Sequence, residues 1–243
     1  MKTICHIGME RSGNHAIMQW IARRYRPYVV TQRVIPQVGK CKAATALNCS
    51  DKMGKHERES ALFYDLVLNG DINKLDRDYD QVFIVLRDPY NWLASLVSSF
   101  YDFNITTCNY RFFVSTWIAH ANSAMSGATW INYNKWIDDE HKLWYANSLG
   151  LPKVKHDDTP SNLGRGSSYG KDADQNYTER YISTLGQTDE SVIYKHILRQ
   201  YPELVFYGRQ LFGMATPPEL SELFADLVNT KRAALSKVDR AIS

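Results

Sequence analysis

A chain of 243 residues, 44% of them hydrophobic, is long enough to bury a sizeable core, and we expect one domain over residues 1–243. Its 29 basic and 26 acidic residues leave a net charge of +3 without a long basic run, which gives no support for binding nucleic acid or an anionic membrane. No signal-peptide pattern, run of about 18 apolar residues or C-x-x-C pair occurs, so we predict reduced thiols, a cytoplasmic location and no transmembrane segment.

Strands and helices are expected to alternate from the start of the chain. A strand is predicted over 3–7 and a helix over 14–25, where apolar residues recur at i, i+3 and i+4. A second strand is predicted over 28–35. Breakers make 36–56 irregular, and a short helix is predicted over 57–69.

The clearest strand is QVFIVL, residues 81–86, whose nearly continuous apolar run is typical of a parallel strand covered on both faces. Asp88 and Pro89 follow as a helix N-cap and first helical residue. The remaining expectations are a helix from there to 103, a helix over 110–125, a strand over 128–133, a helix over 135–148, a Gly-, Ser- and Asp-rich loop over 150–175, and mainly helices from 177 with a break at 216–218.

This alternation predicts a three-layer α/β fold with a mainly parallel central sheet and helices on both faces. In such sheets ligands bind outside the carboxyl ends of the strands. The residues that follow the first strand and the QVFIVL strand are therefore the first candidates for a site.

A glycine loop, GMERSGNH, joins the first strand to its helix. Gly8 and Gly13 give the G-x-x-x-x-G frame of a P-loop, whose inward N–H groups and helix N-terminus cradle an anion, so we expect a P-loop-like fold. Asn14 and His15 replace the Lys-Ser/Thr of ATP- and GTP-hydrolysing enzymes, and Arg11 inside the loop supplies the cation. The alternative is a tight turn without a ligand.

A second candidate anion site follows the QVFIVL strand. Arg87 ends that strand, and Ser95 lies eight residues on, on the helical face shared by Asp88 and Asn91. A guanidinium fork and a hydroxyl in these places can converge on one phosphate. The alternative is an Arg87 paired with a carboxylate and a Ser95 on the helix surface.

Together the segments GMERSGNHAIMQWI and VFIVLRDPYNWLASLVSSFYDF resemble the sulfotransferases that use 3′-phosphoadenosine-5′-phosphosulfate (PAPS), and most closely the short bacterial or viral-type members. The resemblance spans about residues 3–175 in scattered blocks. It implies that the first segment holds the 5′-phosphosulfate and that Arg87 and Ser95 hold the 3′-phosphate. The Thr-Thr usual after the loop glycine is here Asn14-His15.

Two later segments look like parts of the same family. TWINY, residues 129–133, resembles the strand that leads to a Tyr near the adenine, which would be Tyr133; the alternative is a core aromatic. NLGRGSSYG resembles the loop that closes over the nucleotide, although the Arg-Lys-Gly wording is missing. It implies that Arg165, Gly166 and Ser167 contact the 3′-phosphate or adenine, whereas the alternative for Arg165 is a solvated loop residue.

The resemblance implies in-line, metal-independent transfer of a sulfuryl group to an acceptor hydroxyl or amine, with adenosine 3′,5′-diphosphate (PAP) as product. Arg11 would neutralise charge on the departing phosphate oxygen. Ser12, Gly13, Asn14 and His15 would donate to the 5′-phosphate. We expect a small-molecule or carbohydrate acceptor, which the sequence does not identify further, and the sequence indicates no oligomeric state.

A general base is also required, and family members use His or Glu. Glu59, then Glu57 and His56, are the candidates between the two phosphate segments, with Glu10 as a fourth. The alternative for the first three is a solvated charged helix start, and the alternative for Glu10 is a pair with Arg11. Two other functions stay open: a P-loop phosphotransferase that uses ATP, and a catalytically inactive nucleotide-binding relative.

Overall fold

The computed structural model describes residues 2–8, 12–22, 24, 28–34, 61–67, 79–103, 110–153, 180–186, 188–218 and 220–221. Within these ranges the strands form one sheet in which every pair is parallel. Its order is β2-β3-β1-β4-β5. The strands are β1 (Lys2–Ile7), β2 (Tyr28–Val34), β3 (Ala61–Val67), β4 (Gln81–Leu86) and β5 (Trp130–Asn132).

The strand order creates a switch point between β1 and β4. After β1 the chain continues to β2 on one side of the sheet, and after β4 it continues to β5 on the other side. These two strands are direct neighbours, with Ile7 opposite Ile84. Ligands in parallel α/β sheets bind in the crevice at such a point, because the two connections diverge there.

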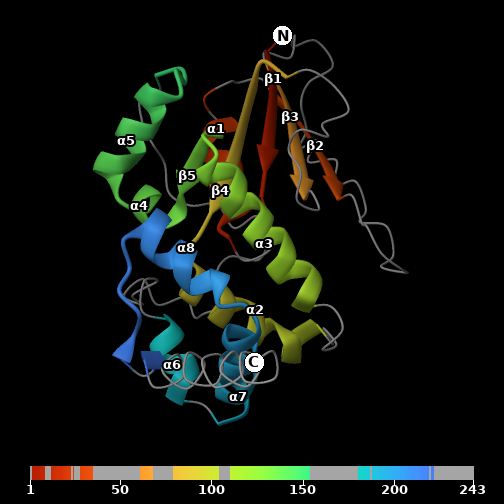
Figure 1. Ribbon diagram of the computed structural model, residues 1–243. Helices are drawn as coiled ribbons and strands as arrows, with labels where there is room; N and C mark the ends of the chain where they lie inside the picture. Colours follow the sequence, from red (N-terminus) through yellow and green to blue (C-terminus); the bar gives the residue numbers. More distant parts are fainter. Residues whose placement is uncertain are drawn as a thin grey trace, which may run out of the picture.

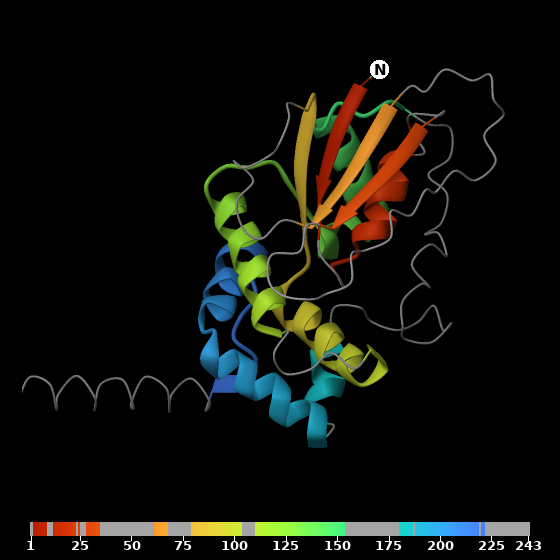
Figure 2. The same ribbon diagram turned by 90° about the vertical axis from the view of Figure 1, so that its right-hand side faces the viewer.

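Helices cover both faces of the sheet (Figures 1 and 2). Inward side chains alternate along each strand, so Ile7 and Ile84 pack toward α2, α3, α7 and α8, whereas Ile4 and Val85 pack toward α1, α4 and α5. This arrangement confirms the predicted three-layer α/β fold. The helices are α1 (Asn14–Ala22), α2 (Pro89–Phe103), α3 (Tyr110–Met125), α4 (Tyr133–Trp136), α5 (Asp139–Ser148), α6 (Arg180–Gly186), α7 (Thr188–Gln200) and α8 (Glu203–Phe212).

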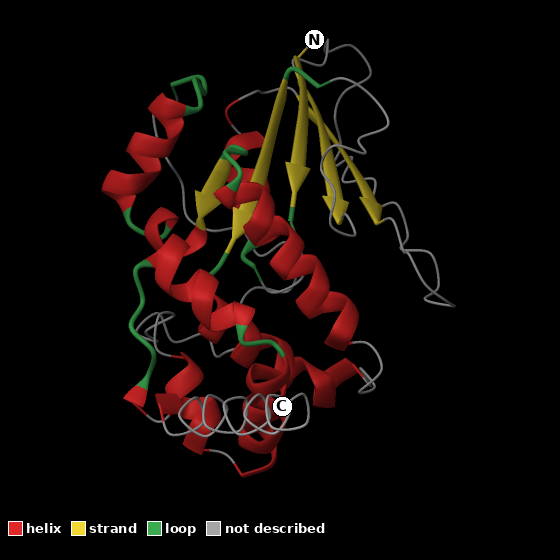
Figure 3. Cartoon of the chain, in the orientation of Figure 1, coloured by secondary structure: helices red, strands yellow, loops and turns green. Residues whose placement is uncertain are grey.

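The helix α2 lies below the carboxyl ends of the strands, among α6, α7 and α8 (Figure 3). Residues 89–97 of this helix are all buried. A buried helix start needs partners for its first N–H groups, and the Asp88 carboxylate accepts the Asn91 backbone N–H at 2.8 Å. The predicted N-cap is confirmed.

Two predicted elements differ from the structure. The helix expected over 57–69 is wrong, because residues 61–67 form β3 between β2 and β1. An interior parallel strand is apolar along most of its length, and periodicity alone does not separate such a run from a buried helix. The helix expected over 135–148 is two helices, because Asp138 adopts an extended conformation and caps α5.

Smaller differences concern the ends of elements. The helix predicted over 14–25 ends at Ala22, and the strand predicted over 128–133 is confined to 130–132. The break predicted at 216–218 starts earlier, at Gly213, whose left-handed conformation ends α8. No helix among the described residues is long and apolar enough to span a bilayer.

We expect the buried centre of β4 to dominate stability. Ile84 has no exposed surface, so Ile84→Ala should lower the free energy of unfolding by about 2–5 kcal/mol through lost burial and a cavity. The same substitution at Ile182, which is 47% exposed on α6, should cost about 0.5 kcal/mol or less. Denaturant unfolding of the two variants measures the difference, and equal losses would contradict the assigned core.

Candidate functional site

The two predicted anion-binding segments begin at adjacent strand ends. Gly8 follows β1, and Arg87 follows β4, its neighbour in the sheet. Gly8 and Ser12 are buried, and Ser12 and Gly13 form the turn that leads into α1. Parallel strands deliver their carboxyl ends to one edge, so both segments lie at the switch point between β1 and β4.

The ring of Tyr133 packs directly on Gly13. Gly13 has φ of +81°, and a Cβ placed there would lie 2.0 Å from Cε2 and 2.1 Å from Cδ2 of Tyr133. No side chain fits in this space, and the positive φ disfavours any residue with a Cβ as well. Glycine at this position is therefore required both by the backbone conformation and by the approach of the aromatic ring.

The same ring lies next to Arg87. The guanidinium carbon of Arg87 is 5.6 Å from the centre of the Tyr133 ring, within the range of a cation–π contact. Arg87 is only 5% exposed. Tyr133 thus lies next to both the loop after β1 and the arginine after β4, so the two predicted segments share one aromatic neighbour.

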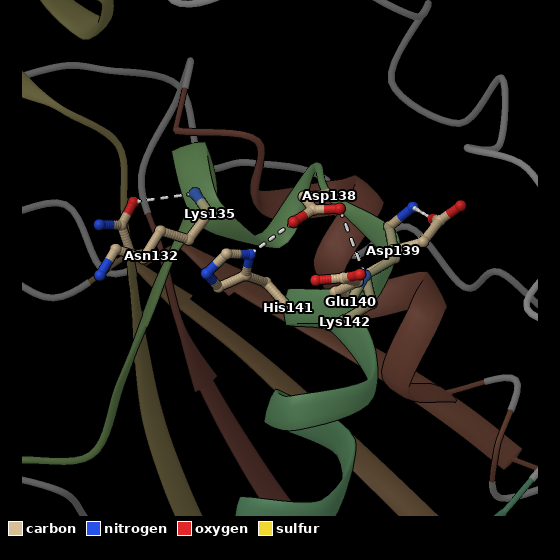
Figure 4. A network of polar contacts seen from close by, with 7 residues as sticks. All are labelled: Asn132, Lys135, Asp138, Asp139, Glu140, His141 and Lys142. Atoms are coloured by element: carbon tan, nitrogen blue, oxygen red, sulfur yellow. Dashed lines mark hydrogen bonds and ion pairs between the residues drawn. The ribbon is translucent and has the colours of Figure 1, made fainter.

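A sharp turn after β5 presents Tyr133 to these partners. The Asn132 side chain accepts the backbone N–H of Asn134 at 3.0 Å, and it also accepts that of Lys135 at 3.3 Å (Figure 4). Asn132 thereby caps the short helix α4. The Asn132 N–H donates to the Tyr145 hydroxyl at 3.0 Å. The strand therefore ends at Asn132, and the next two side chains leave the sheet at its carboxyl edge.

A second cap continues this turn into α5. Asp138 accepts the Glu140 N–H at 3.3 Å and lies 2.6 Å from the His141 Nδ1 (Figure 4). The hydrogen bond with His141 lowers the pKa of Asp138. Both groups are about half exposed, so we assign them to the helix start and not to the site.

The peptide group between Arg87 and Asp88 is held on both of its polar atoms. The Trp117 indole N–H donates to the Arg87 carbonyl at 3.2 Å, and the Asp88 N–H donates to the Asn134 Oδ1 at 3.1 Å. Trp117 is fully buried in α3 and stacks on Trp92. The backbone that carries Arg87 is therefore fixed from α3 and from the turn after β5.

The Asp88 carboxylate is fully buried and accepts hydrogen bonds on both oxygens. Oδ1 accepts hydrogen bonds from the backbone N–H of Asn91 at 2.8 Å and from its side-chain Nδ2 at 3.1 Å. Oδ2 accepts hydrogen bonds from the same Nδ2 of Asn91 at 3.1 Å and from Nδ2 of Asn134 at 2.7 Å. The Asn91 Oδ1 in turn accepts the Tyr181 N–H at 3.1 Å. This network joins the start of α2 to α4 and α6.

The phenols around this carboxylate are neutral in the physiological range. Burial raises the pKa of Tyr90 to about 12. Burial, followed by the charge of Asp88, holds the pKa of Tyr194 well above its ordinary value, and the Tyr194 hydroxyl donates to the Tyr90 carbonyl at 3.3 Å. These groups add no negative charge that would oppose an anion beside Arg87.

Ser95 is 2% exposed within α2, which excludes the alternative of a surface hydroxyl. Asn14 and His15 begin α1, although their side chains lie outside the described residues. The remaining predicted site residues also lie outside the described ranges, and their roles stay predictions. They are Glu10, Arg11, His56, Glu57, Glu59, Arg165, Gly166 and Ser167.

Sequence reasoning missed the contribution of Asn134. A signal was available, because Asn132 and Asn134 flank Tyr133 at the carboxyl end of a predicted strand, where polar side chains tend to line a site. The contact of Asn134 with Asp88 depends on the neighbouring strand, and local spacing does not show it. Trp117 fixes the Arg87 carbonyl although it reads as an ordinary core aromatic.

Comparisons with known proteins give one structural likeness. No family model matches the chain, and no curated protein matches it. Among solved structures it is similar to mouse sulfotransferase SULT7A1 complexed with PAP, with a TM-score of 0.41 and 15% identity. The match covers 63% of this chain and 60% of the mouse chain, so it spans less than two thirds of that protein. The fold assignment rests on the strand order and layers described above.

The contact between Gly13 and Tyr133 predicts an unusual sensitivity to a single methyl group. Gly150 has φ of +61° and no atom within 4 Å of an added Cβ, so Gly150→Ala measures the conformational cost alone. Gly13→Ala should destabilise the chain by a further ~1–3 kcal/mol, because the new Cβ overlaps the ring. Denaturant unfolding of Gly13→Ala and Gly150→Ala, each made in the wild-type chain and in the Tyr133→Ala variant, checks this. If Gly13→Ala still costs more than Gly150→Ala when the ring is absent, the ring contact is not the cause.

Proposed function

We propose that this chain is a PAPS-dependent sulfotransferase that moves a sulfuryl group to a hydroxyl or amine of a small-molecule or carbohydrate acceptor. The observation that carries the proposal is the contact of Tyr133 with both Gly13 and Arg87 at the β1–β4 switch point. This contact joins a glycine loop without the P-loop lysine to a second cationic group. A nucleotide with phosphates at both its 5′ and 3′ positions needs two such places.

The loop after β1 would bind the 5′-phosphosulfate. The Gly13 carbonyl accepts the N–H groups of Ala16 and Ile17 at 3.1 and 3.3 Å, so α1 begins directly at the loop. The first N–H groups of a helix have no intrahelical acceptor, and together with the helix dipole they favour a bound anion. Ser12, Gly13, Asn14 and His15 would provide these donors.

The segment after β4 would bind the 3′-phosphate. Arg87 offers a planar fork of donors and Ser95 a hydroxyl, while Tyr133 lies between this segment and the loop and would contact the adenosine. Arg165, Gly166 and Ser167 would close over the same phosphate.

The chemistry would be an in-line displacement at sulfur. The acceptor oxygen or nitrogen forms a bond to sulfur while the bond from sulfur to the 5′-phosphate oxygen breaks, and PAP leaves. The acceptor proton passes to a base, for which Glu59, Glu57 and His56 are the candidates. Arg11 would stabilise the charge that develops on the departing phosphate oxygen.

The proposal predicts a nucleotide preference that separates it from an ATP-dependent phosphotransferase. At a hundred times its dissociation constant, PAP should raise the free energy of unfolding by about 2.7 kcal/mol, with or without magnesium. ATP with magnesium should stabilise the chain less at the same concentration. Asn14 and His15 stand where a P-loop carries the lysine that binds the ATP phosphates and the Ser/Thr hydroxyl that binds magnesium. Thermal unfolding measures both, and a larger shift with magnesium–ATP would reject the proposal.

Arg87 should determine affinity for the 3′-phosphate. Arg87→Ala should weaken PAP about 10–100-fold, the effect of losing hydrogen bonds to a charged group, and should change adenosine 5′-phosphate little. Arg24 is a matched buried arginine that packs on Trp20 and donates to the Pro152 carbonyl. Arg24→Ala should leave the ratio of the two affinities unchanged. Isothermal titration checks both variants, and an equal loss for both nucleotides in Arg87→Ala would refute the assignment.

A further inference from the structure

We infer that Asn134 is a positioning residue that holds Arg87 in the direction needed to bind the 3′-phosphate. This inference rests on the proposed function, because it names the residue that prepares the proposed 3′-phosphate site. Asn134 acts through the backbone and side chain of Asp88. Its role is to orient Arg87 and not to contact the nucleotide.

A single side-chain amide satisfies two different groups of Asp88. The Asn134 Oδ1 accepts the Asp88 N–H at 3.1 Å, and its Nδ2 donates to the Asp88 Oδ2 at 2.7 Å. Only this orientation of the amide pairs each donor with an acceptor. A carboxylate at position 134 would keep the first bond and would replace the second with two negative oxygens facing each other.

The bond to the Asp88 N–H acts on Arg87 because both residues share one peptide plane. The carbonyl of that plane is fixed by Trp117, and the N–H is fixed by Asn134. Together they set the rotation of the chain where it leaves β4, and so the direction of the Arg87 side chain. Trp117 cannot be replaced without a core cavity, since it is fully buried. Asn134 is only partly buried, and it is the partner that can be changed.

The position of Asn134 in the chain adds a second link. It directly follows Tyr133, whose ring lies 5.6 Å from the Arg87 guanidinium carbon. The cap from Asn132 fixes both residues in the same turn. One turn after β5 therefore supplies the ring beside the guanidinium and the amide that orients its backbone.

The test is the preference for PAP over adenosine 5′-phosphate, measured as the ratio of their dissociation constants. Asn134→Asp is nearly isosteric, and at neutral pH it should reduce this preference about tenfold or more, because one hydrogen bond to a charge is replaced by repulsion. Asn134→Ala should also reduce it. That variant decides the test if Asn134→Asp does not fold.

Lowering the pH should restore the preference in Asn134→Asp relative to wild type at the same pH. Two adjacent carboxylates bind one shared proton more readily than a single carboxylate does, so acidic pH should recreate the lost hydrogen bond. Among the described residues, Tyr90 and Tyr194 interact with the charge of Asp88, and Tyr181 and Arg209 lie beside Tyr90. The phenols of Tyr90 and Tyr194 stay neutral at acidic pH, because burial raises their pKa. Asn134→Ala should show no such recovery.

The reciprocal exchange is the decisive control. In the double variant Asp88→Asn with Asn134→Asp, donor and acceptor trade places at unchanged net charge, so most of the preference should return. Asn122→Asp on α3 is the matched distant substitution, because its side-chain oxygen accepts the Tyr207 hydroxyl and a carboxylate can do the same. It should leave the preference unchanged.

The outcomes separate this inference from the proposed function. A wild-type chain without a preference for PAP would overturn the proposed function and the inference with it. A wild-type preference that survives in Asn134→Asp would overturn the inference alone. So would an equal loss of affinity for both nucleotides, or a double variant that recovers nothing, because a purely structural role gives those results.

Discussion

A fully buried carboxylate at the end of β4 is the constraint on which the site depends. A charge without solvent is costly unless hydrogen bonds compensate it, and Asp88 obtains them from two asparagine side chains and one backbone N–H. These donors come from α2 and from the turn after β5, and Asn91 extends the network to α6. Satisfying this one charge therefore places three elements around the residue that carries the Arg87 guanidinium.

The aromatic ring of Tyr133 makes the second connection, between Arg87 and the glycine loop. Its contact with Gly13 leaves no room for a Cβ, and its face lies beside the guanidinium. The ring continues into a stack with Trp136, which meets Trp20 of α1 edge to face. The loop, the helix that follows it and the arginine are thus packed against one group of aromatic rings, an arrangement that would preorganise the proposed anion site.

Much of the local structure around the candidate site was predictable from short segments. The strand β4, its Asp88 cap, Pro89 and the helix to Phe103 follow local rules, since a cap and the helix that it starts are neighbours in sequence. The roles of Asn134 and Trp117 were not predictable. Both act on the peptide after β4 from elements far along the chain, and no spacing rule links a residue to a partner 30 or 46 positions away.

The sequence by itself determined the alternation of strands and helices, the glycine loop and the arginine at a strand end, because each depends on interactions within a few residues. Only the tertiary structure decided that residues 61–67 are a strand, since they pair with β1 and β2 on either side and their apolar run fits a helix equally well alone. The tertiary structure likewise placed Tyr133 against both Gly13 and Arg87. Such contacts arise from the order of the strands, and that order is set by the packing of the whole sheet and not by any local pattern.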